Sequence, residues 1–243
     1  GYRTAFLADD NFTVYRARAK ELLAAIRGWN ARQTAGRFRF TTQVSIDAAG
    51  DEELLRACAD AGLTHVFIGI ETPNEASLRE AKKRQNLKKN LLDEIQRFID
   101  FGISVDCGMI VGFDGDDTGI FARQYEFAMA TAVPIFSLGT LVAPAATPLH
   151  ARLAKEGRLV KDGSEIAAGP WNTNIIPKLM TSAQLYDGVK WLCNSLYRPE
   201  AFEARVARLI ETFGRRYQPA HALEPQSAEG RAINADSASL IHR

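Results

Sequence analysis

Three apolar stretches of the chain end in residues that could form a binding or catalytic site. Residues 65–71 are largely apolar and end in Glu71, and residues 103–112 become rich in glycine toward their end. A shorter apolar run, residues 4–8, leads into the polar residues 9–11. Buried parallel strands that deliver charged or glycine residues at their C-terminal ends are how α/β barrels build active sites. The pattern therefore predicts a site formed by the ends of several strands.

The cysteines and histidines do not indicate a metal site or a disulfide framework. Cys58, Cys107 and Cys193 lie far apart, none has a CxxC spacing, and the four histidines are equally scattered. Cys58 is interpreted as a small apolar residue on a buried helix face. Because disulfides are not indicated, the default expectation is a reduced, cytoplasmic setting.

Length and composition favour an ordinary globular protein. The chain has 243 residues, of which 46% are hydrophobic and 24% are charged, so it can form a substantial core. The formal net charge of +1 argues against nucleic-acid binding as the main function. No apolar run is long enough to span a bilayer, and no signal peptide is expected.

The hydrophobic pattern predicts strands and helices in alternation. Strands are expected at residues 4–8, 39–46, 65–71, 103–112 and 135–142, and helices at 13–29, 51–62, 91–102, 118–131, 151–159, 181–197 and 199–213. Asp51 is a plausible N-cap, and Gly62 is a natural helix end. Gly102 repeats this arrangement before the next strand. A helix between consecutive strands implies right-handed crossovers and a parallel sheet.

These elements predict an α/β fold, a partial (β/α) TIM-type barrel of parallel strands with a helical C-terminal extension. Residues 1–150 would form the barrel, residues 151–217 the extension, and residues 218–243 a weakly structured tail. Five strands cannot close an eight-stranded barrel, and the strand at residues 4–8 would leave an open sheet edge. We therefore expect the first barrel unit to be missing, and the open edge to allow a homo-oligomer.

The order of the motifs resembles that of the radical S-adenosylmethionine (SAM) superfamily, in particular its cobalamin-dependent type with a helical C-terminal extension. The matching segments are residues 6–12 (FLADDNF) for the second barrel strand, 69–72 (GIET) for the fourth, 108–113 (GMIVGF) for the fifth, 141–149 for the sixth, and 174–205, which begins NIIPK, for the extension. The resemblance covers roughly residues 4–213. Each motif is weak alone, and their common order makes the resemblance specific.

The resemblance implies a site for SAM. The polar residues after the first strand would hold the amino group, since a carboxylate suits an ammonium group. The carboxylate that ends the GIET motif would contact the ribose hydroxyls. The glycine-rich strand would let backbone approach the adenine. The implied cofactor-binding residues are Asp9, Asp10, Asn11, Glu71, Gly108, Ile110, Gly112, Val142 and Ala143.

One departure from the family's pattern changes the expected activity. The family binds a [4Fe–4S] cluster through a CxxxCxxC motif, which this sequence lacks and which its three cysteines cannot replace. The chain is therefore expected to be the C-terminal part of a radical SAM enzyme. The motif, the first strand and any cobalamin-binding domain would lie upstream. Alone, the chain would bind SAM weakly, bind no metal and be catalytically inert.

The parent enzyme would cleave SAM reductively at its cluster for radical chemistry such as methyl transfer. The alternative is a non-catalytic binding or oligomerising module that keeps a barrel remnant. An aldolase-like barrel lacks support, because no lysine lies at a clear strand end. The sequence does not identify the small-molecule substrate. Trp171 would either contact that substrate or pack between the extension and the barrel.

Overall fold

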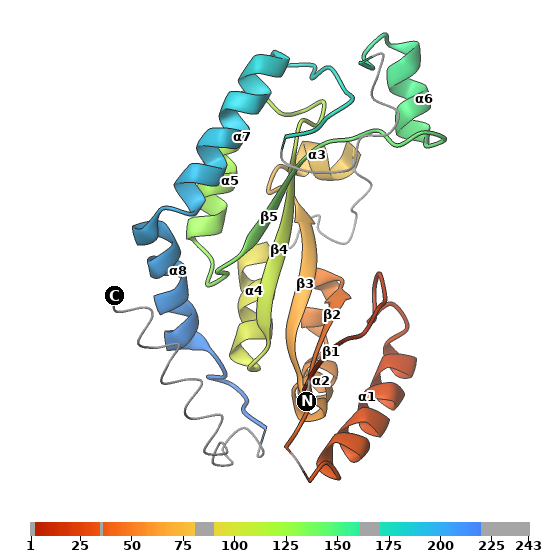
Figure 1. The fold of residues 1–243 in the computed structure, drawn as a ribbon, viewed down its shortest axis with the longest axis vertical. Helices are drawn as coiled ribbons and strands as arrows, with labels where there is room; N and C mark the ends of the chain where they lie inside the picture. Colours follow the sequence, from red (N-terminus) through yellow and green to blue (C-terminus); the bar gives the residue numbers. More distant parts are fainter. Residues whose placement is uncertain (1–2, 35, 81–89, 161–170, 220–243) are drawn as a thin grey trace.

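Five parallel strands form one curled sheet in which every strand pairs with its neighbours in sequence (Figure 1). The computed structural model describes residues 3–34, 36–80, 90–160 and 171–219. Its strands are β1 (Thr4–Phe6), β2 (Arg39–Val44), β3 (Leu63–Glu71), β4 (Ser104–Val111) and β5 (Phe136–Thr140). The expected partial barrel of parallel strands is confirmed.

The helices connect the strands and then continue as the extension (Figure 1). Those between strands are α1 (Arg16–Ala31), η1 (Ile46–Gly50), α2 (Glu52–Ala61), α3 (Glu75–Glu80), α4 (Leu91–Asp100) and α5 (Ile120–Met129). The extension holds α6 (Pro148–Lys155), α7 (Ser182–Leu196) and α8 (Pro199–Thr212). Among the described residues, no helix combines the length and hydrophobicity needed to cross a membrane.

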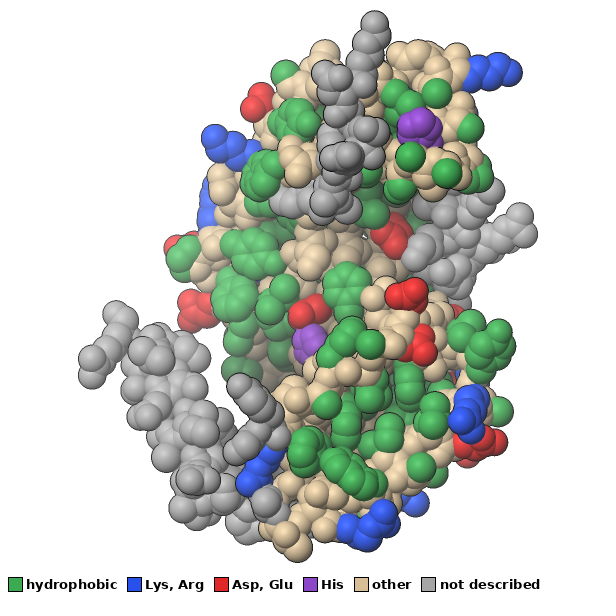
Figure 2. Space-filling model, turned by 45° about the vertical axis from the view of Figure 1, so that its right-hand side comes forward, with side chains coloured by type: hydrophobic (Ala, Val, Ile, Leu, Met, Phe, Trp, Pro, Cys, Tyr) green, Lys and Arg blue, Asp and Glu red, His purple; other side chains and the backbone are tan. Residues whose placement is uncertain are grey.

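The two faces of the sheet have different side chains, because successive residues of a strand point to opposite faces. The face packed against the helices carries the core, with Ile68 and Ile70 of β3 and Val105 of β4 fully buried. The other face is hollow and partly exposed, and most of its strand residues are polar, aromatic or glycine, with Ile110 as an aliphatic exception (Figure 2). The hollow face is therefore the one that can receive a ligand.

Local signals fix several of the element ends as the sequence predicts. The Asp51 side chain accepts a hydrogen bond from Leu54 N and caps α2. Gly62 ends that helix with a φ of 90°, and Gly102 follows α4 with a φ of 74°. Only glycine adopts this left-handed region without strain. A Cβ on Gly62 would also lie 2.7 Å from the carbonyl oxygen of Phe38.

Three predictions about the C-terminal part of the chain turn out differently or fall outside the described residues. The helix expected at residues 151–159 begins at Pro148, because the Thr147 hydroxyl caps it and proline suits a first helical position. Trp171 is 52% exposed, so it is not a buried anchor between extension and barrel. Residues 220–243, most of the predicted tail, lie outside the described residues.

Candidate functional site

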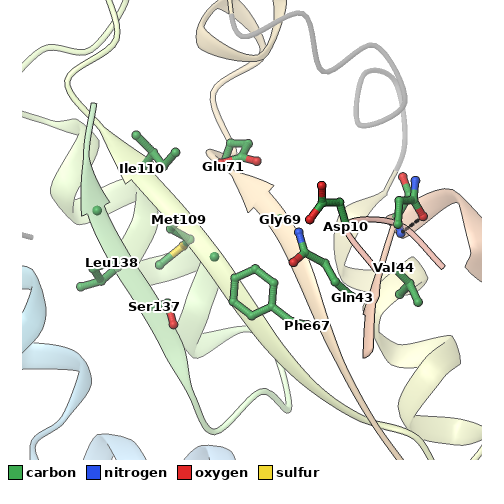
Figure 3. A pocket seen from close by; sticks show the side chains of 14 residues that line it. Asp10, Gln43, Val44, Phe67, Gly69, Glu71, Met109, Ile110, Ser137 and Leu138 are labelled. Carbon is green, nitrogen blue, oxygen red and sulfur yellow. Dashed lines mark hydrogen bonds between the residues drawn. The ribbon is translucent and has the colours of Figure 1, made fainter. Parts of the chain in front are cut away.

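A pocket of about 510 Å³ lies on the hollow face, at the C-terminal ends of the strands (Figure 3). This volume is in the range of small-molecule sites. Each of the five strands, or the loop that follows it, contributes to the lining. The lining residues are Asp10, Asn11, Gln43, Val44, Ser45, Phe67, Gly69, Glu71, Gly108, Met109, Ile110, Ser137, Leu138 and Gly139.

Glu71 lies at a backbone irregularity that directs its side chain. Its φ is 66°, in the left-handed region that non-glycine residues seldom occupy. The register of β3 against β4 slips at this point, since Gly69 lies opposite Gly108 but Glu71 lies opposite Met109. Such a bulge re-aims a side chain, here at the pocket rim (Figure 3). Strained backbone of this kind costs about 1–3 kcal/mol and clusters at ligand sites.

The floor of the pocket is an aromatic ring lying across a glycine. A Cβ added to Gly108 would come within 2.8 Å of Cζ of Phe67. The glycine is therefore required for the ring to lie where it does. The ring lies below Glu71 on the same face of β3 (Figure 3). Together they form a flat apolar surface beneath an acidic rim, which suits a planar ring with polar substituents.

The three polar residues after β1 have different roles. The Asp9 carboxylate accepts a hydrogen bond from Asn11 N at 2.8 Å and shapes the loop. The Asn11 side-chain oxygen accepts from Ser45 N at 3.2 Å and from the Thr13 hydroxyl at 3.1 Å, so it ties this loop to the end of β2. Asp10 lines the pocket itself. The loop thus presents one carboxylate and uses its neighbours for support.

A buried carboxylate joins the loops that follow β3 and β4. Asp116 is completely buried and accepts hydrogen bonds from the Ser77 hydroxyl and from the N–H groups of Gly112 and Phe113, at 2.7, 3.0 and 3.1 Å. Burial raises the pKa of Asp116, and these donors oppose that rise. Asp116 therefore fixes the glycine-rich strand end relative to the segment just after Glu71.

The structure brings together five of the nine residues that sequence reasoning selects, namely Asp10, Asn11, Glu71, Gly108 and Ile110. Asp9 lines an adjoining hollow with Phe6, Ala8, Asp10 and Gln43. The remaining three, Gly112, Val142 and Ala143, do not line the pocket. Gly112 N is bound by Asp116, and Ala143 is completely buried and bound by Asn174.

Sequence reasoning overlooked several lining residues, chiefly Gln43, Phe67, Ser137 and Gly139. Their signal is the two-residue period of strands. Phe67 and Gly69 lie four and two positions before Glu71 and therefore share its face. Gln43 shares its face of β2 with Thr41, and Ser137 is a polar residue near the start of β5. Applying the period to each strand would have found them.

The pocket has an acidic character. Asp10 and Glu71 line it, and the lining contains no lysine, arginine or histidine among the described residues. The carboxylates of Asp10 and Glu71 give the described part of the lining a negative potential in a partly enclosed space, which favours a cationic ligand.

The cysteines do not form a metal site within the described residues, where no group of three histidine, cysteine, aspartate or glutamate side chains could hold a metal ion. Cys58 and Cys107 are buried in the core, and Cys193 lies on α7. Burial raises the pKa of Cys58 to about 12 and also raises the pKa of Cys107. Such thiols are not available as thiolate ligands. The described residues therefore do not fit an iron–sulfur cluster.

Two curated proteins share significant sequence similarity with the chain. An uncharacterized methyltransferase of Synechocystis is 34% identical over 214 residues, which is 87% of this chain and 39% of that protein. The hopanoid C-2 methylase of Rhodopseudomonas palustris is 32% identical over 161 residues, or 65% of this chain and 30% of that protein. The chain thus spans well under half the length of these relatives.

A solved structure shares the fold. The radical SAM methyltransferase TsrM of Kitasatospora setae, solved with cobalamin and a [4Fe–4S] cluster bound, superposes with a TM-score of 0.54. The sequences are 20% identical, and the match covers 82% of this chain and 36% of that one. At this identity the likeness establishes the fold only.

Family models match both parts of the chain. A domain of unknown function (DUF4070) matches residues 147–240, in the extension. The radical SAM superfamily matches residues 1–126, which include the first four strands and most of the pocket. Since that match covers more than half of the 243 residues, the chain belongs to the radical SAM superfamily.

Proposed function

We propose that this chain forms the SAM-binding part of a radical SAM methyltransferase. The observation that carries the proposal is the pocket at the strand ends, which the carboxylates of Asp10 and Glu71 line. SAM has a sulfonium and an ammonium cation, so a negative pocket favours it over neutral nucleosides. The methyltransferase assignment follows the two curated relatives.

The pocket offers partners for the ammonium group, the ribose and the adenine of SAM. Asp10 would accept hydrogen bonds from the ammonium group, with Asn11 and Asp9 supporting its loop. Glu71 would accept from the two ribose hydroxyls, which a carboxylate can do in bidentate fashion. The adenine would lie against the ring of Phe67, which covers Gly108, and against the side chain of Ile110.

The chain's residues bind and orient SAM in this proposal. Bound at a reduced iron–sulfur cluster, SAM supplies a carbon-centred radical. The described residues hold no cluster ligands, so we assign the cluster, and cobalamin as the methyl carrier, to the whole protein. Without the cluster, this chain should bind SAM weakly and show no activity of its own. The hollow face keeps the reacting groups within the barrel.

Calorimetry with two adenosyl ligands tests the assignment. Methylthioadenosine has the adenine and ribose of SAM but lacks its amino acid part. Glu71→Gln should weaken the binding of both ligands by about tenfold, because the ribose contact loses a charged acceptor. Asp10→Asn should weaken SAM alone. Glu53→Gln, at an exposed position on α2, is the matched control.

The two variants separate the outcomes. If Glu71→Gln and Asp10→Asn both bind SAM as tightly as the parent chain, the assigned roles are wrong. If neither adenosyl ligand binds the parent chain at any soluble concentration, the pocket is not a SAM site in this chain.

A further inference from the structure

The hollow face continues below the pocket, and its lower part is not built like the filled interior of a closed barrel. Such interiors are dominated by bulky branched apolar side chains. Here the residues that share a row across the sheet are Phe6, Thr41, His65 and Ser104, followed by a row with Gln43, Phe67 and Asp106. Polar side chains therefore stand on this lower part of the hollow face where a packed barrel core would carry apolar ones.

One charged pair lies on this surface. His65 Nε2 and Asp106 Oδ2 are 3.1 Å apart, and their side chains are 34% and 22% exposed. They come from neighbouring strands, each two residues before the Phe67–Gly108 floor of the pocket. Figure 2 looks onto this face, where a histidine and an acidic side chain lie together among hydrophobic ones.

Both side chains of the pair keep hydrogen-bonding capacity on the hollow face. Among the described residues, neither Nδ1 of His65 nor Oδ1 of Asp106 has a hydrogen-bond partner. A pair that served only to hold the two strands together would gain little, since β3 and β4 are already joined along their whole length. The remaining donor and acceptor positions are therefore available to a ligand.

We propose that His65 and Asp106 are the polar anchor of a substrate-binding surface on the hollow face, directly beneath the SAM pocket. They would bind a hydroxyl or amino group on a substrate that is otherwise apolar. The apolar part would contact Phe6, which is 63% exposed, and Phe67, which is partly exposed. The proposal rests on the proposed function, because it places this substrate beside bound SAM.

Nuclear magnetic resonance of the ¹⁵N-histidine-labelled chain tests the anchor with simple probes. Cyclohexanol supplies a hydroxyl on an apolar ring, cyclohexylamine supplies an amino group, and tetrahydropyran has a ring of the same size with no donor. Cyclohexanol or cyclohexylamine should shift the ring nitrogens of His65 in a saturable way. His150, which lies on α6, should not shift and serves as an internal control.

Two variants make the test decisive. Asp106→Asn should weaken binding of the responding probe about tenfold, because the acceptor loses its charge. His65→Gln, read through the backbone amides of β3 and β4, should do the same. Circular dichroism confirms that both variants are folded. Equal shifts with tetrahydropyran, or undiminished binding to both variants, would overturn the proposal.

Methylthioadenosine added to the same samples separates this inference from the proposed function. If the nucleoside binds and neither the alcohol nor the amine shifts His65, the anchor is wrong and the SAM site stands. If a probe binds at His65 and the nucleoside does not bind, the anchor stands as a binding site and its placement beside SAM is wrong. Of the two probes, the one that binds more tightly identifies the substrate's polar group.

Discussion

The outward-facing backbone groups at the two edges of the sheet are treated differently by the rest of the chain. At β5 the extension supplies side chains where a sixth strand would lie. The Tyr197 hydroxyl accepts a hydrogen bond from Phe136 N at 2.9 Å and donates one to Phe136 O at 2.7 Å. Just beyond the strand, the Asn174 side chain accepts from Ala143 N at 2.8 Å and donates to Ala143 O at 2.7 Å. These side chains imitate the backbone of a neighbouring strand.

Within the part of the chain that the structure describes, the outer edge of β1 has no such cover. Alternate residues of a parallel strand bond to opposite sides, and Arg3 O and Leu7 N bond to β2. Thr4 and Phe6 therefore direct their N–H and C=O groups away from β2. Among the described residues, no strand pairs with that side. The extension therefore satisfies outward-facing backbone groups at the β5 edge. At the β1 edge, such groups remain open to pairing within the described residues.

A buried arginine holds the extension against the sheet. Arg205 of α8 is completely buried and donates hydrogen bonds to the carbonyl oxygens of Val133, Pro134, Leu196 and Ala201, at 2.8–3.1 Å. Burial lowers the pKa of Arg205, because desolvation disfavours its charged form. Arg208 adds bonds to the last carbonyls of α5 at Met129 and Thr131, where the helix dipole favours a cation.

The largest effect should come from breaking this attachment. Arg205→Met keeps most of the side-chain volume but leaves four buried carbonyl groups without their donor. The free energy of unfolding should fall by roughly 3 kcal/mol or more, since each unsatisfied buried group costs about 1–3 kcal/mol. Urea denaturation measures the change. Arg18→Met, on the exposed face of α1, is the matched control, and an equal loss in both variants would contradict the assigned role.

Removing the side chain that bonds the backbone just beyond β5 should have the next largest effect on stability. Asn174→Ala removes a side chain that is 3% exposed and leaves both backbone groups of the buried Ala143 unpaired. The expected loss is about 2 kcal/mol in the free energy of unfolding. Asn174→Asp keeps the acceptor for Ala143 N but removes the donor to Ala143 O. At neutral pH it should therefore lose less stability than the alanine variant only if an unpaired Ala143 N costs more than an unpaired Ala143 O. No measurable loss in either variant would show that water replaces the side chain.

Tyr197→Phe should have a smaller effect at the same edge. The phenylalanine keeps the ring and removes only the hydroxyl that bonds both backbone groups of Phe136. Because Tyr197 is 44% exposed, water can replace part of the interaction, and about 1 kcal/mol should be lost. Hydrogen exchange at the Phe136 amide should also become faster. An unchanged exchange rate would mean that something else protects this edge.

The sequence predicts those parts of the fold whose causes are local. The Asp51 cap and the glycines at 62 and 102 act over a few residues, and each marks its helix end correctly. The order of strands follows from the same periodicities. Glu71 is predicted as a site residue because it ends an apolar run, but its left-handed backbone depends on the register against β4. A slip between two strands has no signature in either strand alone.

The covered edge could not be predicted for the same reason. Asn174 bonds a residue 31 positions earlier, and Tyr197 bonds one 61 positions earlier. Val142 and Ala143 were expected to line the ligand site, and the backbone of Ala143 is instead occupied by Asn174. Motif order identifies which strand a segment forms. It does not say which backbone groups remain available once distant side chains have bound.

Substitutions on β1 give the sharpest test of the difference between the two sheet edges, although the change in stability should be the smallest. We propose that the outer side of β1 pairs with a second copy of the chain, as an exposed parallel edge permits. Thr4→Pro removes an N–H that points away from β2 and should lower self-association in sedimentation velocity with little change in unfolding free energy. Ala5→Pro removes an N–H on the β2 side and should instead destabilise the strand. A chain that is monomeric at high concentration, with the Thr4 and Phe6 amides strongly protected from exchange, would show that this edge is covered too.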